Sequence, residues 1–363
     1  MKIVHTESSL GWGGQEIRVL SEAQGLAKRG HDVQLICPPQ ARIHAEAPNY
    51  GLQPIALPIE QKTFQAMFSL RRWLKANDCD VMSTHSSTDA WMTALALASL
   101  GRPVPMVRTR HISAPVPRNP LSNWLYESAS ARIVTTGEAL KAELVVHNGF
   151  DAEKIESVPT GIDASRFRPG AKLAARHTLG LPGERTLVGI VATLRSWKGH
   201  RFLVEALVGL PSSASLVIVG DGPQRAALEA LVQELQLAGR AVFAGNQRDV
   251  LPWLQALDVF ALPSYANEGV PQALVQAMLV GLPCVTTHVG GIAELAVAGS
   301  TALVVPPQDA GALRAALQRL IADPALAARL GEAARRHCAE RYSYEVMLDR
   351  MEAVYRRVAK PAR

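Results

Sequence analysis

The chain repeats one pattern, in which a short apolar segment is followed by a turn and an amphipathic segment, and it starts that pattern twice. The first start has a predicted strand at 2–7, a glycine turn at 11–14 and a predicted helix at 15–29. The second start has a predicted strand at 187–193 and a predicted helix at 198–207. Such alternation is typical of parallel sheets with helices on both faces. We therefore predict an α/β chain of two doubly wound domains.

A stretch rich in proline and glycine, from about 159 to 185, separates the two starts. We predict a first domain over 1–163, a linker over 164–185, a second domain over 186–342, and a C-terminal helix over 343–363 that packs back on the first domain. A length of 363 residues suits two domains of about 150 to 200 residues each. Further strands are predicted at 33–37, 81–84, 104–109, 132–135, 215–220, 258–262 and 284–287.

Composition excludes several classes of protein. Apolar residues make up 48% and charged residues 19%, which is unlike a disordered chain, and no apolar run is long enough to cross a membrane. The four cysteines form no Cys-x-x-Cys pair, so we expect neither a zinc site nor disulfides. We expect the protein to reside in a reducing cytosol. The net charge of +6 contains 29 Arg and 9 Lys, which fits phosphate-rich partners and equally a GC-rich genome. With 5% aromatic residues, we expect no nucleic-acid partner.

Two short motifs in the first half suggest ligands that the residues around them disfavour. The Gly11–Gly14 turn follows a strand and opens a helix, but a dinucleotide-binding pattern would need glycine where the chain has Glu16. A nicotinamide-dependent dehydrogenase is therefore disfavoured. Asp78 and Asp80 match the Asp-x-Asp metal motif, yet they precede a predicted strand and are better interpreted as a turn.

The second half places two cations and a carboxylate after predicted strands. Arg195 and Lys198 lie at the start of a helix, where both can reach one diphosphate, although two solvated charges on a loop would look the same. Glu268 follows another strand and precedes a helix with Pro271 near its first turn. The Glu268 carboxylate therefore lies beside a helix terminus that attracts anions.

Taken together, several segments resemble the retaining glycosyltransferases of family 4, and their order and spacing cover nearly the whole chain. They are Gly13-Gly14, Thr109-Arg-His111, the interdomain segment 158–169, Lys198-Gly199, the segments 218–223 and 243–245, Pro263-Ser264 and Glu268-Gly269. The resemblance implies the GT-B fold, in which two Rossmann-like domains face each other across a central cleft.

The resemblance also implies roles for individual residues. It places Glu268 and His111 at the catalytic centre, against the donor sugar. It assigns the nucleotide-sugar donor to a second group: Gly13, Gly14, Arg195, Lys198, Gly269, Val270 and Gln276. Four positions depart from the family pattern: Thr193, Gln276, Thr160, and Pro271, which stands where the family has glycine. Thr193 stands where the family has arginine, so Arg195 is expected to supply the missing cation. Gln276 stands where the family has a glutamate that binds ribose, and Thr160 replaces an asparagine.

The first domain of this fold holds the acceptor. Between Asp89 and Glu127 the chain has no acidic residue, while Arg108, Arg110 and Arg118 lie there. We hypothesise that these arginines contact an anionic acceptor, with solvated loop arginines as an equal alternative. Gln15 and His85 are grouped with them as acceptor-binding residues. The expected substrates are a UDP- or GDP-sugar and a saccharide or lipid-linked acceptor, in the biosynthesis of lipopolysaccharide or another surface glycan. No cofactor and no metal are expected.

A predicted helix over 61–75 carries aromatic residues beside Lys and Arg, a pattern found on core helices and on helices that lie on anionic bilayers. We expect a cytoplasmic enzyme that can also sit peripherally on the cytoplasmic face of the inner membrane. Two other functions stay open. One is a GT-B-type sugar epimerase or phosphorylase. The other is a catalytically weak glycosyltransferase-like binding subunit, suggested by Thr193 and Gln276.

Overall fold

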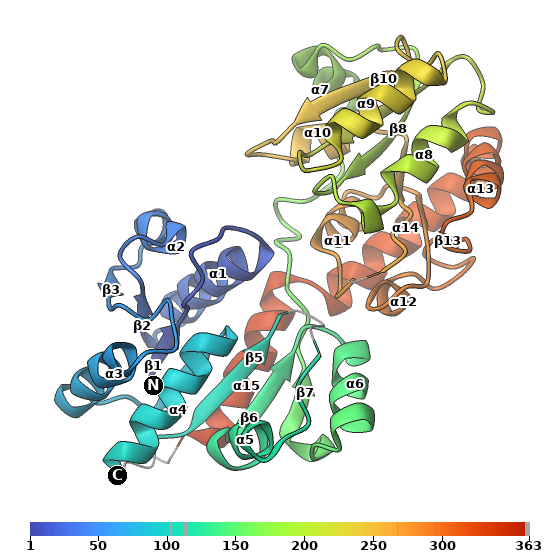
Figure 1. Cartoon of the computed structure of the whole chain (residues 1–363). Coiled ribbons are helices and arrows are strands. Elements are labelled where there is room, and N and C mark those ends of the chain that lie inside the picture. The colour runs from blue at the N-terminus through green and yellow to red at the C-terminus, as the bar shows by residue number, and fades with distance from the viewer. Residues whose placement is uncertain (102–103, 112–114, 267, 360–363) are drawn as a thin grey trace. The chain divides into compact units, whose positions relative to one another are not determined.

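A computed structural model describes residues 1–359 except 102–103, 112–114 and 267. The chain divides into two compact units (Figure 1). The first unit comprises Met1–Gly161 together with Glu345–Arg363, and the second comprises Ile162–Tyr344. Each unit is built on its own parallel sheet, so the prediction of two doubly wound α/β domains is confirmed.

The first unit contains a seven-stranded sheet in the order β3-β2-β1-β4-β5-β6-β7, in which every neighbouring pair is parallel. Its strands are β1 (Lys2–Thr6), β2 (Asp32–Cys37), β3 (Pro54–Ala56), β4 (Val81–Thr84), β5 (Met106–Arg110), β6 (Arg132–Thr135) and β7 (Ile155–Ser157). Its helices are α1 (Gly14–Lys28), α2 (Arg42–Glu46), α3 (Phe64–Ala76), α4 (Ser87–Leu100), α5 (Pro120–Asn123), α6 (Glu138–Asn148) and α15 (Tyr344–Val358).

The second unit contains a six-stranded parallel sheet in the order β10-β9-β8-β11-β12-β13. Its strands are β8 (Thr186–Val191), β9 (Ala214–Val219), β10 (Ala241–Gly245), β11 (Val259–Leu262), β12 (Cys284–Thr286) and β13 (Leu303–Val304). Its helices are α7 (Lys172–Leu179), α8 (His200–Leu207), α9 (Arg225–Glu234), α10 (Leu251–Ala256), α11 (Gln272–Leu279), α12 (Ile292–Leu295), α13 (Ala310–Ala322) and α14 (Pro324–Arg341).

The sheet of the first unit has an apolar cluster on each face, because successive apolar side chains of its strands point to alternate faces. In β2, Ile36 belongs to a cluster with α3 and α4, whereas its neighbours Leu35 and Cys37 belong to a cluster with α1 and α2. Successive side chains of a strand point to opposite faces, so an apolar run buries both. The sheet is thereby fixed between helices, and its strand ends are left to carry polar residues.

Two segments differ from what their sequence suggests. The stretch 164–185, expected as a linker, contains helix α7 within the second unit. Its Arg176 is buried, and the guanidinium donates to the carbonyl of Ala256 and to the carboxylate of Asp258. The sequence pattern also predicts one helix near 119–130, where the structure has the short helix α5 followed by a π-helical turn over Trp124–Ala129. The i→i+5 hydrogen bonds of a π-helix leave no clear mark in a sequence.

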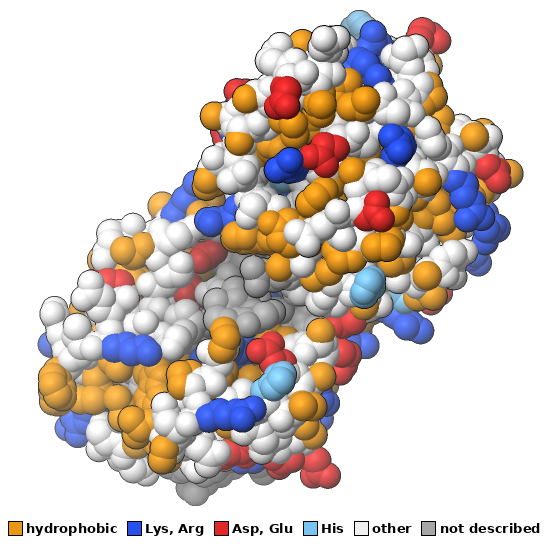
Figure 2. Space-filling model, turned by 45° about the vertical axis from the view of Figure 1, so that its right-hand side comes forward, with side chains coloured by type: hydrophobic (Ala, Val, Ile, Leu, Met, Phe, Trp, Pro, Cys, Tyr) orange, Lys and Arg blue, Asp and Glu red, His pale blue; other side chains and the backbone are white. Residues whose placement is uncertain are grey.

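The surface carries charges of both signs. Figure 2 shows basic and acidic side chains interspersed with apolar ones over the face that it draws. Within the described part of the chain, no helix combines the length and the apolar character that crossing a membrane requires.

Candidate functional site

Each sheet has one point where the strand order reverses, and the candidate site residues lie on or after strands at or next to that point. In the first unit the reversal lies between β1 and β4, and in the second between β8 and β11. Connections from the two strands leave in opposite directions there, which opens a crevice beyond their carboxyl ends where ligands bind. Predicted site residues follow β4 and β5 in the first unit and β8 and β11 in the second.

In the second unit the structure brings Lys198 and Glu268 together. The Lys198 ammonium donates to both carboxylate oxygens, at 2.7 Å to Oε1 and 2.9 Å to Oε2. The Glu268 side chain is 4% exposed and the Lys198 side chain 21%. A buried carboxylate with one partly exposed cation is locally neutral, and the lysine keeps access to solvent. Lys198 can therefore hold the carboxylate and meet a second anion.

The loops that carry this ion pair approach each other through Gly199. Its φ of +76° lies in the left-handed region, and a Cβ there would stand 2.0 Å from the carbonyl oxygen of Pro263. The backbone N–H of Tyr265 donates to the carbonyl of Trp197 at 2.8 Å, next to that approach. Only glycine allows such proximity, so the Lys198-Gly199 pair positions the lysine as well as supplying its charge.

Sequence reasoning did not assign the residues that orient Glu268. The Ser264 hydroxyl donates to Glu268 Oε1 at 2.6 Å, and the Gly291 N–H donates to the Glu268 carbonyl at 3.0 Å. A Cβ at Gly290 would lie 2.1 Å from that same carbonyl oxygen. Two glycines after a strand are typical of a turn, but only the fold shows that this turn lies against Glu268.

The other predicted donor-binding residues have different surroundings. Arg195 is exposed, with its guanidinium carbon 5.3 Å from the centre of the Trp197 ring. Gly269 and Val270 follow Glu268 and lead to Pro271, the N-cap of α11, while Gln276 is half-buried within that helix. In the first unit, Gly13 is the N-cap of α1 and Gly14 its first residue.

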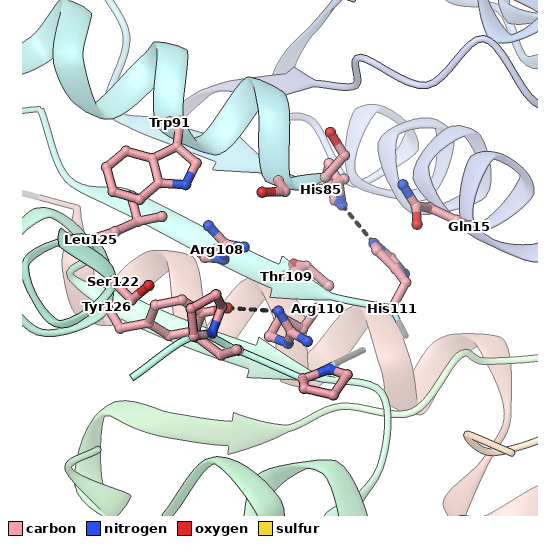
Figure 3. A pocket seen from close by; sticks show the side chains of 15 residues that line it. Gln15, His85, Trp91, Arg108, Thr109, Arg110, His111, Ser122, Leu125 and Tyr126 are labelled. Carbon is pink, nitrogen blue, oxygen red and sulfur yellow. Dashed lines mark hydrogen bonds between the residues drawn. The ribbon is translucent and has the colours of Figure 1, made fainter. Parts of the chain in front are cut away.

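The first unit has a pocket of about 290 Å³ at the carboxyl ends of β4 and β5. Figure 3 shows Arg108 and Arg110 on the same side of β5, two residues apart, with His111 at the strand's end. Four of the five predicted acceptor residues line it, as does the predicted catalytic histidine: Gln15, His85, Arg108, Arg110 and His111. Arg118, the fifth, is exposed and is not among its described lining residues.

A chain of three imidazoles runs from the pocket into the sheet. His111 Nε2 lies 3.1 Å from His85 Nδ1, and His85 Nε2 lies 2.9 Å from His5 Nδ1 (Figure 3 shows the first bond). Burial lowers the pKa of all three, for His111 with help from the charge of Arg18, so they are neutral near pH 7. Each neutral imidazole donates once, which couples the tautomer of His111 to that of His85.

Two buried carboxyl groups, those of Asp89 and Glu7, lie near the three histidines. Asp89 accepts from the Thr6 hydroxyl at 2.7 Å and from the backbone N–H of His85 at 2.9 Å. Together with Ser86 it also caps helix α4. Burial and, second to it, the charge of Asp89 together raise the pKa of Glu7 to about 8. Glu7 Oε2 accepts from the Gln15 amide at 2.6 Å, which positions that pocket residue. Among the described residues, no three His, Cys, Asp or Glu side chains are placed so that they could hold a metal ion together.

Comparison with known families matches both halves of the chain. Residues 12–166 match the model of Glycosyltransferase Family 4, and residues 172–337 match that of Glycosyl transferases group 1. The D-inositol 3-phosphate glycosyltransferase of Rhodococcus opacus is 30% identical over 95% of this chain and 85% of its own length.

Solved structures share the fold. A glycosyltransferase from Rickettsia africae superposes with a TM-score of 0.91 at 20% identity, covering 99% of each chain. HepE of Anabaena, solved with UDP, superposes with a TM-score of 0.88 at 19% identity, covering 98% of this chain and 100% of its own. Two Rossmann-like parallel sheets, both family models and a relative that matches along most of its length lead to one assignment: the chain belongs to the GT-B glycosyltransferases of family 4.

Proposed function

We propose that the protein transfers a sugar from a nucleoside-diphosphate sugar to an acceptor, with retention of the anomeric configuration. The observation that carries the proposal is the Lys198–Glu268 ion pair at the strand reversal of the second unit. HepE, which has the same fold, is solved with UDP, and this supports a UDP-sugar as the donor, with a GDP-sugar as the alternative.

The charges of the second unit suit departure of a diphosphate. The Lys198 ammonium, partly exposed, is placed to meet the negative charge that develops on the leaving oxygen. Glu268 is oriented by Ser264 so that its carboxylate can accept hydrogen bonds from donor-sugar hydroxyls. His111, neutral and held by His85, is proposed to contact the donor sugar. These groups supply the stabilisation themselves, so we propose that no metal ion takes part.

The acceptor is proposed to be a saccharide or a lipid-linked saccharide, of the kind assembled into lipopolysaccharide or another surface glycan. The first-unit pocket supports this proposal, because hydroxyl, amide and arginine groups line it beside the aromatic ring of Trp91. A second candidate is a phosphorylated polyol. It is favoured by the name of the Rhodococcus opacus relative, an enzyme that acts on D-inositol 3-phosphate.

The donor proposal predicts that one nucleotide sugar will stabilise the protein against heat. A ligand at a hundred times its dissociation constant adds about 2.7 kcal/mol of stability. We expect a UDP- or GDP-sugar to raise the melting temperature, and an added acceptor to release the nucleoside diphosphate at a rate that EDTA leaves unchanged. NMR of the product should show the donor's anomeric configuration. Absence of any shift across UDP- and GDP-sugars would refute the proposal.

We also propose that helix α3 rests on the cytoplasmic face of the inner membrane. Ala66, Leu70 and Leu74 face the core, whereas Phe64 and Phe68 are 78% and 56% exposed. Basic side chains accompany the two rings along the helix: Arg71, Arg72 and Lys75. An exposed aromatic pair beside cations is suited to an anionic bilayer interface.

Replacing both rings, Phe64→Ser with Phe68→Ser, should reduce flotation with phosphatidylglycerol vesicles by at least about tenfold, because each buried ring contributes about 1.5 to 3 kcal/mol. The matched control is Val146→Ser, since Val146 is 75% exposed on α6. Equal flotation of the double variant and the control would disprove the membrane role of α3.

A further inference from the structure

The pocket of the first unit is cationic without a matching anion. Its described lining includes two arginines, three serines and no carboxylate. The carboxyl group of Asp89 lies behind the lining, where Thr6, His85 and Ser86 already donate to it. The described lining of the pocket therefore offers Arg108 no carboxylate partner.

Arg108 is the most unusual member of this lining. It is 4% exposed, and neither Nε nor Nη1 has a hydrogen-bond partner in the described part of the chain. Its guanidinium carbon lies 4.6 Å from the centre of the Tyr126 ring, a cation–π contact. Burial lowers the pKa of Arg108, and Tyr126, which also hydrogen-bonds this side chain, raises it. A buried guanidinium with unsatisfied donors is costly, and a bidentate oxyanion is the ligand that best removes the cost.

Further cations surround this guanidinium. Arg110 donates to the Tyr126 hydroxyl at 2.7 Å on the same side of β5. The Lys62 ammonium lies 3.2 Å from the Ser87 hydroxyl and 5.8 Å from the centre of the Trp91 ring. Burial lowers the pKa of Lys62, and the positive charge of Arg108 lowers it further, as expected for one cation near another.

We propose that Arg108, with Arg110 and Lys62, forms an oxyanion subsite that binds a phosphate or carboxylate group of the acceptor. The proposal rests on the proposed function and specifies the acceptor as an anionic molecule. Ser86, Ser87 and Ser122 supply hydroxyl groups to the same pocket, and the Trp91 ring is part of its lining. Pocket residues from α4, β5 and α5 hold these groups in a rigid frame.

The test compares charged and neutral probes on the whole chain. Glucose 6-phosphate and glucuronate are titrated by calorimetry, with glucose as the neutral counterpart, in the presence and in the absence of UDP. We expect an anionic probe to bind, and Arg108→Gln to weaken its binding by at least about tenfold. Lys62→Gln, at an exposed position that folding does not require, should weaken it in the same direction. Lys28→Gln, at an exposed cation on α1, is the matched control.

The outcomes separate the subsite from the transferase proposal. Weaker phosphate binding in both variants with unchanged UDP binding supports a phosphate subsite, and the same result with glucuronate supports a carboxylate subsite. Glucose binding as tightly as either anion, binding of neither anion, or Arg108→Gln and Lys62→Gln both matching Lys28→Gln would overturn the subsite. Failure of the native protein to bind either UDP or GDP while it binds glucose 6-phosphate through Arg108 would refute the donor proposal and leave the subsite standing.

Discussion

Replacing Glu268 by glutamine is expected to lower sugar transfer by about 100- to 1,000-fold, the range seen when one preorganised polar group is removed from a catalytic centre. The variant keeps the side-chain volume but loses the charge that holds Lys198 at 2.7 and 2.9 Å. The glutamine amide must also point its NH₂ group, which is a donor, at the Lys198 ammonium or the Ser264 hydroxyl, and both of these groups donate to Glu268. Both the lysine and the hydrogen bonds to the donor sugar are then misplaced, so the turnover number should fall more than donor affinity does.

The matched control for this variant is Glu229→Gln. Glu229 forms an ion pair with Arg225 at 2.8 Å, but its side chain is 46% exposed on α9, so its removal should leave transfer unchanged. Lys198→Ala provides an independent check, since it should weaken binding of the nucleoside diphosphate itself. A Glu268→Gln enzyme that transfers sugar within about threefold of the native rate would exclude the proposed role of Glu268.

Much of the fold could be predicted because the central strands are long and apolar. The predicted strand at 81–84 matches β4, and the predicted restart at 187 falls one residue after the start of β8. The edge strands β3, β7 and β13 were not predicted, because segments of two or three residues carry no periodicity. Helix α7 was missed within a stretch whose prolines and glycines indicate a linker.

The candidate site could be predicted in part, for a similar reason. Lys198 and Glu268 lie 70 residues apart, and each was recognised as a polar residue after a strand. Their contact follows from the pairing of β8 with β11, which a strand pattern does not contain. Arg195 was expected at the diphosphate, but its position over Trp197 depends on rotamers that sequence does not fix. His5 was missed because a histidine inside a buried strand resembles any core residue.

Replacing Glu22 by leucine is expected to cost about 3 to 5 kcal/mol of stability, the range for removing one partner of a buried ion pair. Arg18 and Glu22 have fully buried side chains, with Arg18 Nε 3.6 Å from Glu22 Oε2. The Tyr355 hydroxyl of α15 donates to Glu22 Oε1 at 2.7 Å, and Arg18 Nη1 donates to the Val158 carbonyl at 2.7 Å. Loss of Glu22 leaves a buried guanidinium without its carboxylate, while the Tyr355 hydroxyl keeps only its hydrogen bond with Ser83.

The geometry of this pair also predicts how the loss can be recovered. Neither Arg18 Nε nor Glu22 Oε2 has a hydrogen-bond partner among the described residues, so burying both charges is poorly compensated. Arg18→Met combined with Glu22→Leu should therefore restore stability to near the native value or above it, as for other buried pairs replaced by apolar residues. Urea unfolding would measure the free energy of unfolding of both variants, and hydrogen exchange would report the local stability of α1 and α15. Equal destabilisation by the single and the double variant would contradict this prediction. It would show that the Arg18 hydrogen bond to the Val158 carbonyl stabilises the fold even without Glu22.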